Sequence, residues 1–235
     1  MLRFPLAILV VFVHGFGADI DVAQLHASGL TGAAVYDYVR LFCSVVIARS
    51  AVPIFFVISG YLLFQKVEEY GKQVYVGKLK KRWHSLVIPY LSWNVLIVLW
   101  TLAFKLGGIL LHGKPWSGFG DYFLQKGCLH MLWDSSVWDE RTTWLGVETH
   151  NSGPVLLPFW YMRDLIMMVV LSPAFFWLIK RLRFFFILLL MAVYAFDIRV
   201  AWMSGTFTAA GLFFGCGAYF AIMKQDFTDV LWKWR

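Results

Sequence analysis

Six apolar stretches, separated by polar or basic segments, constrain this chain more than any other feature of its sequence. An α-helix needs about 20 apolar residues to cross the hydrocarbon core of a bilayer. The predicted spans are about Leu2–Phe16, Ala48–Phe64, Leu86–Leu111, Val155–Ile179, Phe184–Phe196 and Gly205–Met223. An interfacial or tilted helix is expected over 35–47, ahead of the second span. The sequence therefore predicts an all-α, polytopic transmembrane helical bundle of about six spans.

The composition excludes most other classes of protein. Hydrophobic residues make up 60% of the chain and charged residues 15%, against about 45–50% and about 25% in soluble domains. A soluble domain of this size could not cover so much apolar surface. An ordinary soluble enzyme, a disordered chain, a coiled coil and a compact nucleic-acid-binding domain are therefore excluded, and no nucleic-acid partner is expected despite the net charge of +7.

The basic residues predict how the spans are oriented. With the N-terminus in the cytoplasm, thirteen of the 21 Lys and Arg residues fall in the N-terminus, the loop Gln65–His84, the link Lys180–Arg183 and the tail. The outer segments Gly17–Gly32 and His112–Pro154 carry only Lys114, Lys126 and Arg141. This distribution follows the positive-inside rule. The alternative for the N-terminus is a cleaved signal peptide, which the further spans disfavour.

Two ionisable residues lie in the first predicted span. Arg3 and His14 are eleven residues apart, which is close to three helical turns and about 16 Å along the axis, so both side chains are expected on one face. A neutral histidine is tolerated at such a depth and can take up a proton near pH 7. The alternative for His14 is an interfacial histidine bonded to neighbouring backbone, and the alternative for Arg3 is a positive-inside anchor.

Other polar groups at membrane depth are candidates for binding a substrate. Arg49 precedes a run in which Pro53 can kink the helix beside a cavity, while Ser59 is small enough to allow close helix approach. Arg163 follows Trp160-Tyr161-Met162 near the start of the fourth span. The alternatives are helix packing for Ser59 and anchoring at the outer interface for Arg163.

The basic run Lys78-Leu79-Lys80-Lys81-Arg82 leads into the third span. It could hold the phosphates of a nucleotide-like donor or of anionic lipid, or serve only as topology charge. The three cysteines have no metal-ligand spacing, and the sequence lacks a Gly-rich phosphate loop, HExxH and GxSxG. We therefore predict no bound metal or cofactor.

Several segments together resemble the acyltransferase family 3 group of integral membrane proteins. In chain order they are Arg3 followed after ten residues by His14, the run 52–62 (VPIFFVISGYL), the basic run into 86–94 (LVIPYLSWN), the segment 158–165 (PFWYMRDL) with Ser172-Pro173, and the Gly-rich segment 211–219. Each segment is a weak signal, but their order and spacing are fairly specific, and they cover nearly all of the chain.

The resemblance implies an O-acyltransferase of the bacterial cytoplasmic (inner) membrane. Such proteins take an acyl group, usually acetyl, from the co-substrate acyl-CoA in the cytoplasm and place it on a hydroxyl of a cell-surface glycan or lipid-linked saccharide at the outer face. His14 falls on the family's essential histidine, and Arg3 on an arginine tied to donor binding or positioning. The resemblance makes Lys81 and Arg82 candidates for contact with the CoA phosphates. The predicted donor- or substrate-binding residues are these two with Arg49, Ser59, Trp160 and Arg163. A general base and a covalent acyl-histidine both stay open.

The family core has roughly ten spans, so the resemblance implies a single membrane-embedded domain over 1–235 that is incomplete at its C-terminus. Two other functions are open: a transporter or flippase of a glycan intermediate, and an inactive remnant of the family. In a transporter, intramembrane Arg and His would line a path rather than do chemistry. Binding of acyl-CoA separates the enzyme from the transporter, and dependence on His14 separates it from the remnant. The expected partners are acyl-CoA, a glycan acceptor and membrane lipid.

Overall fold

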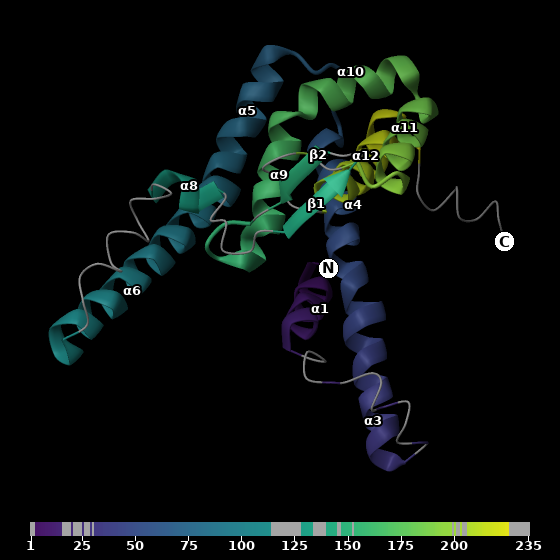
Figure 1. The fold of residues 1–235 in the computed structure, drawn as a ribbon. Helices are drawn as coiled ribbons and strands as arrows, with labels where there is room; N and C mark the ends of the chain where they lie inside the picture. Colours follow the sequence, from purple (N-terminus) through teal and green to yellow (C-terminus); the bar gives the residue numbers. More distant parts are fainter. Residues whose placement is uncertain are drawn as a thin grey trace.

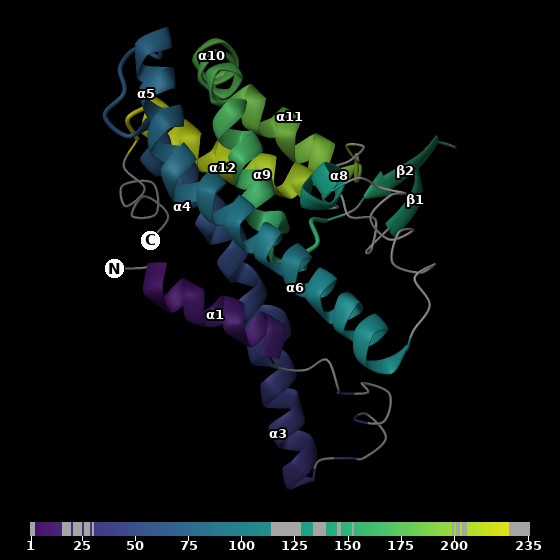
Figure 2. The ribbon, with the colours of Figure 1, turned by 90° about the vertical axis from the view of Figure 1, so that its left-hand side faces the viewer.

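The computed structural model describes residues 3–15, 20, 25, 29, 31–113, 128–133, 140–144, 147–151, 153–198, 200, 203 and 206–225. The first helix, α1 (Arg3–Gly15), is 13 residues long. At 1.5 Å per residue it measures about 20 Å, which is shorter than the hydrocarbon core of about 30 Å. It packs against the first of two long helical rods (Figure 2).

Two helical rods dominate the fold. The first runs without interruption over Gly32–Phe64, 33 residues, and comprises α3 (Gly32–Leu41), a π-helical segment (Phe42–Ile47), a 3₁₀ turn (Ala48–Ser50) and α4 (Ala51–Phe64). The second runs over Lys72–His112, 41 residues, and comprises α5 (Lys72–Arg82), a π-helical segment (Trp83–Val87) and α6 (Ile88–His112). The rods diverge from one end of the molecule (Figure 1).

Each irregular segment lies just before a proline. Pro53 cannot donate a backbone hydrogen bond to the carbonyl of Arg49, and Pro89 cannot donate one to the carbonyl of Ser85. The local widening or tightening of the helix takes up this loss, so both rods continue through their prolines.

The rods correct two expectations from the sequence. The stretch 35–64 forms one helix rather than an interfacial helix followed by a separate span. The expected loop Gln65–His84 is non-helical only over 65–71, because α5 already begins at Lys72. The residues of α5 are mostly Lys, Gln, Leu and Arg, which are good helix formers. Their charge indicated a position outside the membrane but carried no information about conformation.

The fourth predicted span is broken. It comprises a 3₁₀ turn (Leu157–Phe159), α9 (Trp160–Val170) and α10 (Ser172–Leu182), and the helix direction changes by 61° at Leu171. The break precedes Pro173, which lies in the first turn of α10 where proline is tolerated. Arg183 then reverses the chain with a φ of 52°.

The last two helices match the sequence closely. α11 (Phe184–Ala195) and α12 (Phe207–Ile222) begin and end within two residues of the predicted fifth and sixth spans. In the described part of the chain, two helices are long and apolar enough to span a membrane, or three if the bent pair counts as one. The helical, membrane-embedded class is therefore confirmed, whereas six spans and their orientation stay predictions.

A short helix and a hairpin lie between α6 and α9. The helix is α8 (Cys128–Trp133), and β1 (Glu140–Trp144) pairs with β2 (Val147–Asn151) in an antiparallel register that places Thr142 opposite Thr149. Threonine, valine and tryptophan favour strands. The hairpin is a local addition to a helical fold, and hydropathy alone did not predict it.

The core forms where α4 and α12 cross, with α9, α10 and α11 around them (Figure 1). Its largest fully buried apolar side chains include Phe56, Phe64 and Phe214, and Phe214 packs edge-on against Phe175 with ring centroids 5.3 Å apart. Two glycines allow the helices to meet backbone to backbone. A Cβ on Gly60 would collide with the carbonyl oxygen of Phe214 and lie 3.0 Å from the nitrogen of Ala218.

Gly217 is the reciprocal contact from α12. A Cβ there would collide with the carbonyl of Val57 and lie 2.9 Å from the nitrogen of Tyr61. Neither collision can be relieved by a side-chain rotation, because the atoms met are backbone atoms.

We therefore expect Gly60→Ala and Gly217→Ala each to lower the free energy of unfolding by about 1–3 kcal/mol, the usual cost of overpacking. The measurement is thermal or denaturant unfolding in detergent micelles, followed by tryptophan fluorescence. Gly77→Ala is the matched control, because a Cβ there meets nothing within 4 Å and alanine favours the helix. Equal stability of the Gly60 and Gly77 variants would contradict the close contact.

Candidate functional site

A cavity of about 470 Å³ opens where α4, α9, α11 and the start of α12 meet. Its lining residues are Arg49, Val52, Pro53, Phe56, Trp160, Tyr194, Thr206, Ala209, Ala210 and Phe213. Small-molecule sites typically measure about 300–1,000 Å³ and are mostly apolar with a few polar groups that fix orientation. This cavity has that character, and we call it the Arg49 cavity.

The local sequence explains why there is space here. Arg49 lies in the 3₁₀ turn between the π-helical segment and α4, so the first rod is irregular where it meets the cavity. Pro53 presents a ring rather than a long side chain, and Ala209 and Ala210 leave room along α12. The lining residues that carry polar side-chain groups come from four separate segments, namely Arg49, Trp160, Tyr194 and Thr206.

α1 packs against the irregular segment 42–50 and against α4, beside the turn that carries Arg49. The backbones of Arg3 and His14 lie on this helix, but their side chains lie outside the described part of the structure. The fold therefore brings the helix with the predicted catalytic pair next to the Arg49 cavity.

The other predicted binding residues separate into distinct places. Arg49 and Trp160 line the same cavity although they are far apart in the sequence. Ser59 is half-buried on α4 and is not one of the lining residues. Lys81 and Arg82 end α5 on the second rod, where Lys81 is exposed and Arg82 half-buried. The structure does not bring them to the Arg49 cavity.

Arg163 does not line the Arg49 cavity but is packed inside the fold. Its side chain is fully buried, with its Nε 3.6 Å from the Oδ1 of the fully buried Asp164. Its Nη1 donates a 2.7 Å hydrogen bond to the carbonyl of Trp133, and the guanidinium lies 5.6 Å from the centroid of the Trp133 ring.

Three consecutive carbonyls at the end of α8 are satisfied by three different elements. Arg163 of α9 reaches Trp133, the Tyr90 hydroxyl of α6 donates to Leu132, and the amide of Val155 donates to Met131 at 3.1 Å. The last carbonyls of a helix have no intrahelical partner and must find one elsewhere. These bonds fasten α8 to the bundle, and we call them the α8 clamp.

Sequence reasoning did not single out Tyr90 or Asn94 as anchoring residues. Asn94 is fully buried; its Nδ2 donates to the Tyr90 carbonyl at 2.8 Å, and its Oδ1 accepts from the amide of Leu156 at 3.2 Å. The available signal was an asparagine in an apolar run, one helical turn after a tyrosine. Buried polar groups in a membrane need partners of this kind.

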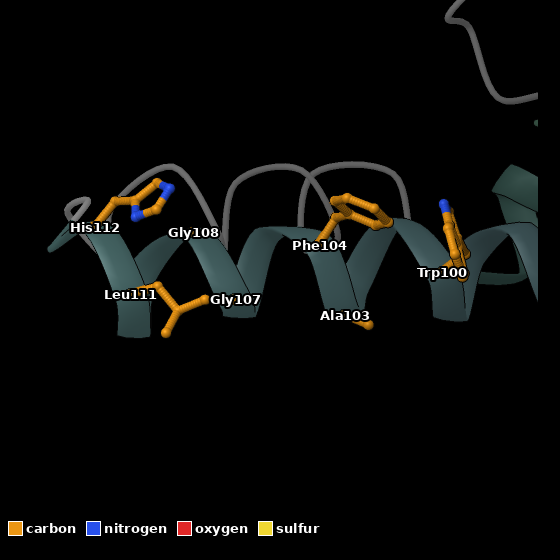
Figure 3. A pocket seen from close by; sticks show the side chains of 7 residues that line it. All are labelled: Trp100, Ala103, Phe104, Gly107, Gly108, Leu111 and His112. Atoms are coloured by element: carbon orange, nitrogen blue, oxygen red, sulfur yellow. The ribbon is translucent and has the colours of Figure 1, made fainter.

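Another hollow, of about 500 Å³, lies along α6 (Figure 3). Trp100, Phe104 and His112 point to one side of the helix there. All the described lining residues belong to this single helix. Because no second described element contributes a side chain, we assign no ligand to it.

The environments of the two arginines predict a large loss of stability for one substitution and almost no change for the other. Arg163→Met would leave the buried Asp164 carboxylate without its guanidinium and the Trp133 carbonyl without its donor, at a cost of about 3–5 kcal/mol. Arg49→Met, at an exposed position, should change stability by no more than about 0.5 kcal/mol. Unfolding in detergent micelles measures both, and equal effects would contradict the division of roles.

Comparisons with known proteins identify the family of this chain. The model of a family described as an acyltransferase domain matches residues 1–235. The succinoglycan biosynthesis protein ExoH of Rhizobium meliloti strain 1021 is 26% identical over 182 residues, which are 77% of this chain and 42% of that protein, so the match spans less than half the relative's length. No solved structure matches. The chain therefore belongs to acyltransferase family 3.

Proposed function

We propose that this chain transfers an acyl group, acetyl in the simplest case, from cytoplasmic acyl-CoA to a hydroxyl of a cell-surface glycan or its lipid-linked precursor. The observation that carries the proposal is the Arg49 cavity, with α1 packed beside it. Family membership supports acyl transfer, and the succinoglycan biosynthesis relative supports a polysaccharide acceptor.

The chemistry assigns a role to each group. His14 takes the proton of the acceptor hydroxyl, and the hydroxyl oxygen attacks the thioester carbonyl. Arg49 stabilises the negative charge that develops on the carbonyl oxygen. The carbon–sulfur bond then breaks, and the CoA thiolate leaves and takes up a proton. A covalent acyl-histidine would divide the same transfer into two steps.

We propose that the chain lies in the bacterial inner membrane with its N-terminus in the cytoplasm, and the packing of α4 and α12 supports this orientation. Residues from the starts of both helices line one cavity, and residues from both ends line another, so the helices run in the same direction. If both cross the membrane, an odd number of crossings must separate them. The rod through α6 and the bent pair α9–α10 are candidate spans, and we propose the shorter apolar helix α11 as the third crossing. The positive-inside rule then places the ends of α4 and α12 in the cytoplasm.

The decisive test is transfer of labelled acetyl from acetyl-CoA to glycolipid in membrane vesicles that contain the chain. We expect His14→Ala to lower the rate by about 10²–10⁴-fold, the usual contribution of a general acid–base group. Arg49→Gln should lower it by about 10²–10³-fold, as for the loss of an oxyanion donor.

The matched control is His112→Ala, because His112 lies at the far end of α6 and is exposed. Its rate should equal that of the wild type, and membrane insertion should be the same for all variants. A wild-type rate from His14→Ala would disprove the mechanism.

A further inference from the structure

A second cavity lies at the opposite end of the α4–α12 pair. It measures about 350 Å³ and is lined by Tyr61, Gln65, Lys66, Phe220, Ala221, Lys224 and Gln225. Arg49 lines the first cavity and Lys66 the second, and these residues are 17 positions apart on nearly continuous helix, or about 25 Å along its axis. We call it the Lys66–Lys224 cavity.

Both helices end in the same unusual way. Lys66 follows α4 with a φ of 63°, and Lys224 follows α12 with a φ of 54°. Glycine is the usual residue in this left-handed conformation at a helix end, because side chains other than Gly are strained there. The chain instead places a lysine at both ends, each next to a glutamine in sequence, and both lysines line one cavity.

The charges around the cavity are predominantly positive. Lys78 donates to the carbonyl of Leu63 in the last turn of α4, and Lys180 acts on Glu68 through space. Glu68 is the acidic neighbour, with its Oε1 2.9 Å from the Nζ of Lys224. The Lys224 ammonium holds the pKa of Glu68 below its ordinary value, so this carboxyl is ionised at neutral pH. Lys66 and Lys224 line the cavity and Glu68 pairs with Lys224, so these three groups sum to a net charge of +1.

Helix capping does not account for the lysine side chains. Cations at helix C-termini are stabilising in general, but backbone amides already satisfy several of the terminal carbonyls here. The amide of Gln65 donates to Tyr61 at 2.8 Å, and the amide of Gln225 donates to Phe220 at 3.1 Å. Among the described residues, Lys66 makes no ion pair, and Lys78 already serves the end of α4.

We propose that the Lys66–Lys224 cavity binds a phosphate ester. Two ammonium groups and two side-chain amides supply donors from both helix ends, and lysine binds phosphate as a compact charge. The cavity has room for one phosphate and part of the group that it esterifies. Two sources share this chemistry, namely the phosphates of a coenzyme A donor and the headgroup of an anionic lipid. The coenzyme A source rests on the proposed function, whereas the site itself does not.

The test uses the full chain purified into nanodiscs of neutral phosphatidylcholine. One arm titrates adenosine 3′,5′-bisphosphate, which carries two of the three phosphates of coenzyme A, by isothermal titration calorimetry. The other arm exchanges phosphatidylglycerol into the nanodiscs and measures the anionic lipid retained by the protein with native mass spectrometry. The key variant is Lys66→Gln with Lys224→Gln, and Lys72→Gln is the control, because Lys72 is exposed and is not a lining residue.

We expect the double variant to weaken binding of one of the two probes by about tenfold or more, since a hydrogen bond to a charged group contributes enough for that change. Lys72→Gln should bind like the wild type. Glu68→Gln should bind more tightly, because the competing carboxylate is gone. Thermal unfolding checks that the exposed substitutions leave the fold intact.

The two arms separate the sources of the phosphate. Loss of bisphosphate binding in the double variant assigns the cavity to the donor, and loss of retained phosphatidylglycerol assigns it to lipid. A wild-type chain that binds neither probe, or a double variant that binds both like the wild type, would overturn the proposal. Because binding needs no turnover, His14→Ala should leave it unchanged, which separates this site from the proposed catalysis.

Discussion

The backbone contact between α4 and α12 is the interaction on which the rest of the structure depends. Lipid tails are as apolar as leucine side chains, so helices in a bilayer associate through close packing rather than through the hydrophobic effect. Gly60 and Gly217 remove the two Cβ atoms that would hold the backbones apart. The crossing then fixes a parallel pair around which α9, α10 and α11 pack. It also closes the centre of the pair and leaves a cavity at each end.

The role of a charged residue in this protein depends on the groups that surround it. Arg163 is buried against Asp164 and fastens α8 through the Trp133 carbonyl, whereas Arg49 lines an open cavity. The cost of burying a guanidinium is tolerable only where it is paired and hydrogen-bonded. Arg163 meets that condition and so belongs to the scaffold, whereas Arg49 is the arginine that lines the first cavity among the described side chains.

Features that depend on neighbouring residues could be predicted from the sequence, whereas features that depend on contacts between distant segments could not. The ends of α11 and α12 were predicted within two residues, because a change in hydropathy is a local property. The helical state of 72–84 was missed, since the same lysines are compatible with a loop or with a helix outside the apolar core. The pairing of Arg49 with Trp160 in one cavity could not be predicted, because it depends on how α9 crosses α4. The sequence predicted Arg3 and His14 on one helix, and both backbones lie on α1. Their side chains lie outside the described part of the structure.

The sequence by itself determined the class of protein and its family. Both follow from features that are local in the sequence. These features are the apolar runs, the basic links and the ordered motifs from Arg3 to the Gly-rich last helix. Only the tertiary structure decided which polar groups meet. Arg49 and Arg163 have the same charge at membrane depth in the sequence. The packing of α1, α4, α9 and α12 gave one a cavity and the other a buried structural partner, because long-range contacts set the surroundings of each side chain.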